Sequence, residues 1–299
     1  MAVRATPPGS DADGSPGGAG RLVLVGTPIG NLGDLSPRAR EVLARADVVC
    51  CEDTRRTRGL LAHAGITGAH LVSLHGHNED SRVDAVLGRL AGGGTVAVVT
   101  DAGTPAVSDP GARLVAAAAA AGALVTTVPG PSAVVAALVV SGLPTERFCF
   151  EGFLPRKGPD RRRRLAVLAG ADSTAVVFEA PGRLAATLGD LVAACGPDRP
   201  VAVARELTKL HEEVWRGSLA DAAEEFAARD VRGEVVVVLG AAPVSPRVPG
   251  DEAVADAVGR RLAAGDSMRD AAAEVARDLG VPRRRAYEAA LAQRRNAGP

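Results

Sequence analysis

The segment that decides the fold is Val96–Gly111, which reads VAVVTDAGTPAVSDPG. Its apolar start, Val96–Val99, predicts a buried strand, and the alanine-rich Ala112–Ala121 predicts the helix after the loop. In α/β proteins, such loops hold ligands at the carboxyl ends of parallel strands. Small residues let a ligand approach the backbone, and the loop carries more carboxylate than a phosphate-binding loop would. The polar contacts would come from three side chains, Asp101, Ser108 and Asp109.

Four other predicted strands end in loops of the same kind, rich in Gly, Pro and small polar residues. The strands are Arg21–Val25, Val48–Cys51, His70–Leu74 and Leu124–Val128, and the loops read GTPIGNL (26–32), CEDTRRT (51–57), SLHGHNE (73–79) and PGPSA (129–133). Strands that alternate with helices predict a mostly parallel sheet with helices on its faces. The carboxyl ends of parallel strands meet at one edge, so we expect the five loops to gather there.

A second α/β unit is predicted to begin near Phe148. Its expected strands are Phe148–Phe153, Ala175–Phe178, Val201–Ala204, Val214–Arg216 and Glu234–Leu239. Between the first two strands lies a basic loop, PRKGPDRRRR (155–164), and Ser218 with Asp221 predicts a capping box that starts a helix ending at Arg229.

These patterns predict two α/β domains with a cofactor cleft between them and a small C-terminal helical extension. The expected divisions are a disordered leader (1–20), an N-terminal α/β domain (21–143), a C-terminal α/β domain (144–240), a proline-rich linker (241–251) and a helical tail (252–299). In the tail we expect helices over Glu252–Ala264, Ser267–Leu279 and Pro282–Gln293.

Composition narrows the class of protein. Lys plus Arg and Asp plus Glu number 35 each, so a polyanion partner must be met by a local basic patch. No CxxC pair occurs among the four cysteines, which predicts reduced thiols in a buried core. The sequence shows no signal peptide and no apolar run of membrane-spanning length, so we expect a cytoplasmic location.

Several common site motifs are absent. There is no GxGxxG after Val25, no GxxxxGK[ST], no HExxH and no Cys/His cluster. His75 and His77 stand two apart in a loop, which is weak evidence for a metal, and we predict none. Ser132 lacks the following glycine of a nucleophile elbow and is predicted to cap the next helix. A ligand bound by backbone, small residues and carboxylates is neutral or cationic at its reactive end, and S-adenosylmethionine meets that description.

Seven motifs in order, GTPIGNLGDLSPRA, EDTRRT, SLHGHNE, DAGTPAVSDPG, VPGPSA, FEAPGR and RELTKLHEE, resemble the tetrapyrrole methylase superfamily. Within it the chain resembles the ribosomal RNA small subunit methyltransferase I family, whose members are cytidine-2′-O-methyltransferases. The resemblance runs from about Leu22 to Leu239, and the DAGTPAVSDPG and RELTKLHEE segments are its most specific parts. Gly182 in FEAPGR departs from the histidine of YESPHR-like members.

The resemblance implies a dimeric enzyme that folds S-adenosylmethionine into the cleft between its domains. It implies a substrate in the decoding region of 16S ribosomal RNA, free or in the assembled 30S subunit, at one cytidine ribose. The cofactor-binding residues would be Gly26, Thr27, Pro28, Asp101, Ala102, Gly103, Thr104, Pro105, Ser108, Asp109, Pro129, Gly130, Ser132 and Ala133.

The expected reaction is a direct in-line displacement, in which the ribose 2′-oxygen attacks the methyl carbon of the sulfonium, the bond from sulfur to that carbon breaks, and S-adenosylhomocysteine leaves. Positioning supplies much of the acceleration, and a base or a strong hydrogen-bond acceptor would help the weakly acidic hydroxyl. Candidates for catalysis, not ranked by the sequence, are Glu52, Asp53, Glu179, Glu206 and Lys209. Candidates for RNA binding are Arg55, Arg156, Lys157, Arg161, Arg162, Arg163, Arg164, Arg183 and Arg205.

Three other functions are compatible with parts of these patterns. A methyltransferase of the same fold could act on a corrin or porphyrin, although the arginine-rich segment argues against it. A non-catalytic RNA-binding assembly factor would not need so many polar loops at one sheet edge. A nucleotide-dependent oxidoreductase would need the dinucleotide fingerprint that the sequence lacks.

Overall fold

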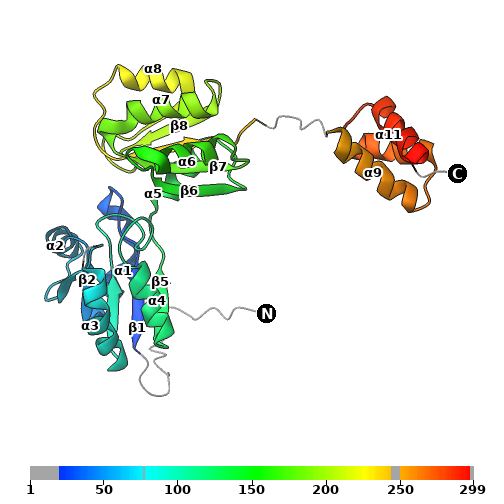
Figure 1. Ribbon diagram of the computed structural model, residues 1–299. Helices are drawn as coiled ribbons and strands as arrows, with labels where there is room; N and C mark the ends of the chain where they lie inside the picture. Colours follow the sequence, from blue (N-terminus) through cyan, green and yellow to red (C-terminus); the bar gives the residue numbers. More distant parts are fainter. Residues whose placement is uncertain (1–19, 77, 244–249, 297–299) are drawn as a thin grey trace. The chain divides into compact units, whose positions relative to one another are not determined.

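The computed structural model describes residues 20–76, 78–243 and 250–296 (Figure 1). The chain divides into two compact units, one ending at Ala242 and the other beginning at Pro243. Residues 1–19 of the predicted leader, His77 and most of the predicted linker lie outside the described residues.

The first sheet of the larger unit is five-stranded and parallel, in the order β3-β2-β4-β1-β5. Its strands are β1 (Arg21–Val25), β2 (Val48–Cys51), β3 (Leu71–Ser73), β4 (Thr95–Val98) and β5 (Leu124–Val128). The central strands are runs of Val, Leu, Ala and Cys, as expected for strands buried on both faces. The parallel sheet predicted from the sequence is confirmed.

Helices cover both faces of this sheet. One core contains Leu43 and Leu61 of α1 (Pro37–Arg45) and α2 (Thr54–His63). The other contains Leu90 and Leu114, from α3 (Glu79–Ala91) and α4 (Ala112–Ala120). The layering leaves the carboxyl ends of the strands free to carry the loops.

Two serines predicted to start helices behave differently. Ser36 accepts a hydrogen bond from the Ala39 backbone N–H at 3.1 Å, and Pro37 occupies the first turn of α1. Ser132 precedes α5 (Ala133–Val140), but its side chain makes no capping hydrogen bond. The predicted capping role of Ser132 is therefore wrong.

The second sheet is mixed, in the order β6-β7-β10-β8-β9, and only β6 and β7 run parallel. Its strands are β6 (Phe148–Phe153), β7 (Thr174–Glu179), β8 (Pro200–Arg205), β9 (Glu213–Ser218) and β10 (Val235–Leu239). The last strand, β10, is inserted between β7 and β8 and consists of five buried residues, VVVVL.

The two faces of the second sheet have different partners. One face packs against α6 (Gly158–Ala169), α7 (Leu184–Cys195) and α8 (Leu219–Ala227). The other packs against α5, whose Val134, Ala137 and Leu138 are buried with Val176 and Val236. Because α5 follows the first sheet in the chain, this contact fastens the two sheets into one unit.

In the second half of the larger unit, which contains the second sheet, four strand boundaries shift by one or two residues and two helices differ from prediction. The arginines at 161–164 belong to α6 and not to a loop, and α8 ends at Ala227 instead of Arg229. The capping box of Ser218 and Asp221 is confirmed, because the Ser218 hydroxyl accepts from the Asp221 N–H and the Asp221 carboxylate accepts from the Ser218 N–H.

The smaller unit contains α9 (Asp251–Ala263), α10 (Met268–Asp278) and α11 (Arg283–Asn296). Val254, Val258, Val275, Ala286 and Ala290 form its core. In the part of the chain that the structure describes, no helix has both the length and the apolar character needed to cross a membrane.

Candidate active site

Three strand-end loops of the first sheet are fastened together by backbone contacts. Thr27 and Gly103 exchange two backbone hydrogen bonds, of 2.9 and 3.1 Å, and the Thr27 hydroxyl donates to the Thr100 carbonyl. A Cβ on Gly26 would lie 2.7 Å from the Gly130 Cα, so only glycine permits this approach. The predicted gathering of the loops is therefore seen for the first, fourth and fifth loops.

The second loop is attached through Asp101. One carboxylate oxygen of Asp101 accepts from the Asp53 N–H at 3.1 Å, and the other lies 3.5 Å from the Arg56 guanidinium. The Glu52 carboxylate accepts from the Thr100 hydroxyl at 3.4 Å. Asp101 therefore braces the loop 51–57 and leaves part of its carboxylate at the cavity described below.

The third loop contributes Glu79, which is only 5% exposed. Its Oε1 accepts hydrogen bonds of 3.0–3.1 Å from the backbone N–H groups of Gly111, Arg113 and Leu114. These are the free N–H groups at the start of α4, whose own N-cap residue is a glycine with φ of 124°. A side chain from the preceding helix thus fixes the end of the loop 101–111.

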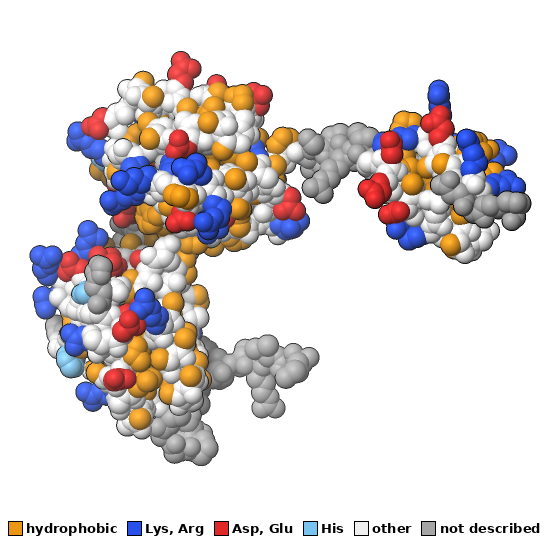
Figure 2. Space-filling model, in the orientation of Figure 1, with side chains coloured by type: hydrophobic (Ala, Val, Ile, Leu, Met, Phe, Trp, Pro, Cys, Tyr) orange, Lys and Arg blue, Asp and Glu red, His pale blue; other side chains and the backbone are white. Residues whose placement is uncertain are grey.

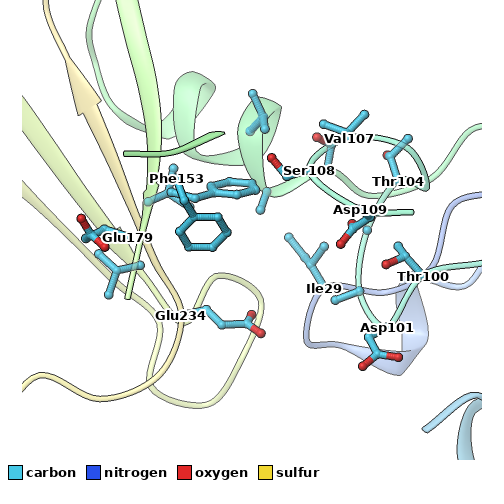
Figure 3. Close-up of a pocket in the computed structure, with 18 of the residues that line it drawn as sticks. Ile29, Thr100, Asp101, Thr104, Val107, Ser108, Asp109, Phe153, Glu179 and Glu234 are labelled. Carbon is cyan, nitrogen blue, oxygen red and sulfur yellow. The ribbon is translucent and has the colours of Figure 1, made fainter. Parts of the chain in front are cut away.

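A cavity of about 380 Å³ lies at this edge of the first sheet and is closed by the second half of the unit (Figure 3). Residues from the first half that line it are Ile29, Arg56, Thr100, Asp101, Ala102, Gly103, Thr104, Val107, Ser108, Asp109, Ser132, Ala133 and Val134. Residues from the second half are Phe153, Phe178, Glu179, Ala180, Pro181, Gly233, Glu234, Val235 and Val236.

The predicted cofactor residues fall into two groups. Eight line the cavity: Asp101, Ala102, Gly103, Thr104, Ser108, Asp109, Ser132 and Ala133. The other six are outside its lining: Gly26, Thr27, Pro28, Pro105, Pro129 and Gly130. Of the latter, Gly26, Thr27 and Gly130 hold the lining loops in place.

Asp109 has the most unusual electrostatics in the cavity. Burial raises its pKa to about 6, the charges of Glu52 and Asp101 add to the rise, and a hydrogen bond with Thr100 offsets part of it. The Thr100 hydroxyl has a single proton, so it serves Glu52 or Asp109 at any one time. Asp109 is consequently a half-buried carboxyl that exchanges a proton near neutral pH.

Glu179 lies at the end of β7, across the cavity from Asp109 (Figure 3), and is 2% exposed. Its Oε1 accepts from the Ala180 N–H and pairs with Arg183 at 2.5 Å, while its Oε2 accepts from the Thr187 hydroxyl at 2.6 Å. Donors on both oxygens fix the orientation of the Glu179 carboxylate. Gly182, where the resemblance led us to expect histidine, faces open space.

Glu206 and Lys209 lie outside the cavity lining but contact Glu234, which lines it. The Lys209 ammonium is 2.8 Å from Glu206 and 3.1 Å from Glu234. Hydrogen bonds from Lys209 and from the Glu234 N–H lower the pKa of Glu206. Glu206 and Thr208 have positive φ values of 52° and 67°, an uncommon conformation for residues other than glycine.

Glu52 and Asp53 also lie outside the lining. Asp53 caps α2 by accepting from the Arg55 N–H at 2.7 Å, and hydrogen bonds with Arg55 lower the Asp53 pKa to about 2. Asp53 and the predicted RNA-binding Arg55 therefore form a local pair.

Sequence reasoning missed the apolar part of the lining and Glu234. The apolar part includes Ile29, Val107, Phe153 and Phe178. The two phenylalanines could have been considered from the sequence, because only 2% of its residues are aromatic and there were few such candidates. Glu234 carried no sequence signal, since it precedes a strand that the topology inserts into the middle of the sheet.

The predicted RNA-binding residues differ in their freedom to bind RNA. Arg161 is held by Asp190 at 2.8 Å, by the Thr187 hydroxyl at 3.0 Å and by the Pro155 carbonyl at 2.9 Å. Arg164 pairs with Glu151, and Arg205 with Glu213. Arg183 is tied to Glu179.

The remaining cations of this segment are more accessible. Arg163 pairs with the exposed Asp160, whereas Arg156, Lys157 and Arg162 are exposed and pair with no carboxylate among the described residues. Figure 2 shows Lys and Arg side chains gathered over the region where Figure 1 places α6.

The described residues contain no cluster of three or more His, Cys, Asp and Glu side chains suited to a metal ion. His77, one of the two histidines considered from the sequence, is outside them.

Comparison with known proteins identifies two matching family models. One, described as Tetrapyrrole (Corrin/Porphyrin) Methylases, matches residues 21–223. The other, described as RsmI C-terminal HTH domain, matches residues 249–294.

Two curated relatives match nearly the whole chain, and both are named Ribosomal RNA small subunit methyltransferase I. The protein from Mycobacterium tuberculosis (strain CDC 1551 / Oshkosh) is 52% identical, over 94% of this chain and 98% of the relative. The protein from Synechocystis sp. is 44% identical, over 91% of this chain and 98% of the relative.

Solved structures share the fold. Uroporphyrin-III C-methyl transferase from Thermus thermophilus, complexed with S-adenosyl homocysteine, matches with a TM-score of 0.53 and 25% identity, over 74% of this chain and 97% of that one. A conserved hypothetical protein from Aeropyrum pernix matches with a TM-score of 0.57 and 23% identity, over 93% of this chain and 98% of that one.

Proposed function

This chain belongs to the tetrapyrrole methylases and, among them, to the ribosomal RNA small subunit methyltransferase I family, and we propose that it methylates a cytidine ribose in 16S ribosomal RNA. The methyl donor is S-adenosylmethionine, and the acceptor is the ribose 2′-oxygen in the decoding region. The observation that carries the proposal is the cavity, in which five carboxylate and hydroxyl side chains of one loop region lie opposite a second-half lining that combines apolar side chains with Glu179 and Glu234.

The cavity suits S-adenosylmethionine in both shape and charge. Thr100, Asp101, Thr104, Ser108 and Asp109 offer oxygen atoms to a positively charged ligand. Apolar side chains, among them Ile29, Val107 and Val134, offer contacts to an uncharged ring. One cation, Arg56, lines the cavity and lies 3.5 Å from the Asp101 carboxylate. Four carboxylates line the cavity as well, those of Asp101, Asp109, Glu179 and Glu234, and this excess of acid disfavours a phosphate group.

When bound, S-adenosylmethionine supplies a methyl group activated by its sulfonium charge. The chain's own task is to align the ribose oxygen with that methyl group and to accept the hydroxyl proton. Asp109 is the best proton acceptor in the cavity, because its raised pKa of about 6 makes it a stronger base than an ordinary carboxylate. Glu179 is less suited, because donors already occupy both of its oxygens.

The RNA backbone would be held by the exposed cations of the segment 155–164. Three exposed cations can contact phosphates directly: Arg156, Lys157 and Arg162. Arg163 can do so once its surface ion pair with Asp160 breaks. The whole chain carries no net charge, so this local cluster would supply the attraction.

The test is transfer of a labelled methyl group from S-adenosylmethionine to protein-free 16S RNA, to assembled small subunits and to a tetrapyrrole. We expect label at one cytidine ribose of the RNA, located by nuclease digestion, with one of the two RNA forms preferred. Label in the tetrapyrrole and none in either RNA substrate would contradict the proposal. RNA binding without any transfer would favour an assembly factor.

We also propose that the enzyme is a homodimer, as the family resemblance implies. Val135 and Val139 on α5 are 50% and 63% exposed, and Leu124 on the edge strand β5 is 53% exposed. Apolar side chains exposed on a helix and on a sheet edge are suited to cover the same surface of a second copy. Sedimentation should give a dimer for the native chain and a monomer for Val139→Glu; a native monomer would contradict this.

A further inference from the structure

An irregularity in β6 turns Phe153 toward the cavity. In the pairing with β7, Phe150 lies opposite Val176 and Gly152 opposite Val177, so Glu151 is an extra residue. Phe153 then lies opposite Phe178. Without the bulge, Phe153 would share a face with Cys149, which packs on the helix-covered core, instead of with Phe150.

The bulge depends on a glycine and joins the two halves. Gly152 has φ of 64°, a conformation that favours glycine, and a Cβ there would lie 3.2 Å from the Ser108 hydroxyl oxygen. The backbone of β6 therefore approaches the loop 101–111 directly beside Phe153. In Figure 3, Phe153 lies between Glu179 and the loop that carries Ser108 and Asp109.

Phe153 is exposed in a chain that has few aromatic residues. The sequence contains five Phe, one Trp and one Tyr. Three of these phenylalanines meet here: Phe178 contacts Phe150 and Phe153 edge-to-face, with ring centroids 4.8 and 5.6 Å apart. Phe153 nevertheless remains 54% exposed, so one part of its ring is supported while another is open.

The residues that follow Phe153 in the chain suit the binding of a nucleotide. Arg156 and Lys157, both exposed, follow within four residues. An aromatic ring next to cations is the usual arrangement in proteins that bind unpaired nucleotides, because bases stack on the ring while phosphates meet the charges.

We propose that Phe153 is the stacking platform for the nucleobase whose ribose is methylated, an inference that rests on the proposed function. The base stacks on the open face of the ring, and the phosphates beside it reach Arg156 and Lys157. The ribose is then held between the second half and the loop that carries Ser108 and Asp109. Phe153 is thus a substrate-binding residue and not a wall for the adenine of the cofactor.

The experiment uses the full chain and the RNA substrate that the native enzyme methylates. Phe153→Leu removes the ring and keeps an apolar side chain, whereas Phe153→Trp keeps a stacking surface. Phe148→Leu is the matched control, because Phe148 is a 44% exposed phenylalanine at the other end of the same strand. Each variant is measured for RNA affinity, for KM and kcat, and for affinity toward S-adenosylhomocysteine.

We expect Phe153→Leu to weaken RNA binding by about 5- to 150-fold, the range known for stacking of one base. Phe153→Trp and Phe148→Leu should bind RNA nearly as the native chain does, and S-adenosylhomocysteine affinity should change less than twofold in all variants. Equal RNA affinity for Phe153→Leu and the native enzyme would overturn the inference. An equal loss of S-adenosylhomocysteine affinity would assign the ring to the cofactor instead. If the native enzyme transfers no methyl group to RNA, the proposed function fails first.

Discussion

The two halves of the larger unit build their sides of the cavity by different means. The parallel sheet offers backbone, small residues and carboxylates on loops that fasten one another through Thr27, Gly103 and Glu79. The mixed sheet offers aromatic rings beside the carboxylates of Glu179 and Glu234, and its exposed cations follow β6 in sequence. A fixed backbone suits a small ligand that is always the same. Exposed rings and flexible cations suit a long, variable polymer such as RNA.

Among the variants that test this difference between the two halves, the largest effect is expected at Asp109 of the first half. If this carboxyl accepts the ribose proton, Asp109→Asn should lower kcat by about 10²- to 10⁴-fold, the usual contribution of a general base. Asp84→Asn, at an exposed position of α3, is the matched control and should leave kcat unchanged. A loss of less than threefold for Asp109→Asn would show that the carboxyl does not act as the base.

The raised pKa of Asp109 also predicts two pH effects of opposite direction. The reaction needs the ionised carboxylate, so kcat should rise with pH through about 6 in the native enzyme, and Asp109→Asn should lose this dependence. The pKa of Asp109 in the folded protein lies above the ordinary value of 3.8. The stabilising contribution of Asp109 is therefore fully present at pH values below 3.8. It is lost as the pH rises through about 6, so Asp109→Asn should unfold at higher denaturant than the native chain at pH 7.5. An unfolding midpoint equal to the native one would contradict the burial of this charge.

Glu79 tests whether the first-half loops are held rigidly. Glu79→Ala removes the acceptor of two buried backbone N–H groups and one partly buried one, and we expect a loss of about 3 kcal/mol in the free energy of unfolding. Urea denaturation measures it, with Glu41→Ala on the exposed side of α1 as the control. A loss no greater than that of the control would mean that Glu79 does not stabilise the start of α4.

The cations of the second half should act on RNA alone. Changing Arg156, Lys157 and Arg162 to Gln should weaken RNA binding about tenfold at moderate salt. It should also reduce the slope of log affinity against log salt by about two, since single strands release about 0.7 ion per contact. The same three changes at Arg38, Arg45 and Arg89, exposed residues of the first half, are the control. Equal slopes for the two triple variants would remove the segment 155–164 from the RNA interface.

The smallest effect is expected at Ser132, which occupies the N-cap position of α5 without a capping hydrogen bond, and Ser36 serves as the comparison. Ser36→Ala should cost about 1 kcal/mol of stability, because the Ser36 hydroxyl accepts from the Ala39 N–H. Ser132→Ala should cost almost nothing, because its side chain makes no capping hydrogen bond. Equal costs in thermal unfolding would restore the capping role predicted from the sequence.

The sequence was sufficient where local pattern and topology agree. Apolar runs such as Val48–Cys51 define the parallel strands, and parallel strands must present their loops at one edge, so the lining by Asp101, Ser108 and Asp109 could be anticipated.

It was insufficient where the outcome depends on tertiary contacts. The arginines at 161–164 appear in sequence as one basic run, yet the helix turns Arg161 onto Asp190 and Thr187 and leaves Arg162 exposed. The bulge that aims Phe153, and the insertion of β10 that brings Glu234 to the cavity, depend on pairing between distant strands. The pattern of apolar and polar residues within one segment does not indicate which distant strand that segment pairs with.

The most direct test of the division between the halves compares Ala102→Leu with Phe153→Leu. Ala102 lines the first-half side of the cavity, where a larger side chain should exclude the cofactor. Calorimetric titration should show that Ala102→Leu loses S-adenosylhomocysteine binding and keeps RNA binding. Phe153→Leu should keep S-adenosylhomocysteine and lose RNA affinity. If each variant weakens the binding of both ligands equally, cofactor binding and RNA binding are not separated between the two halves.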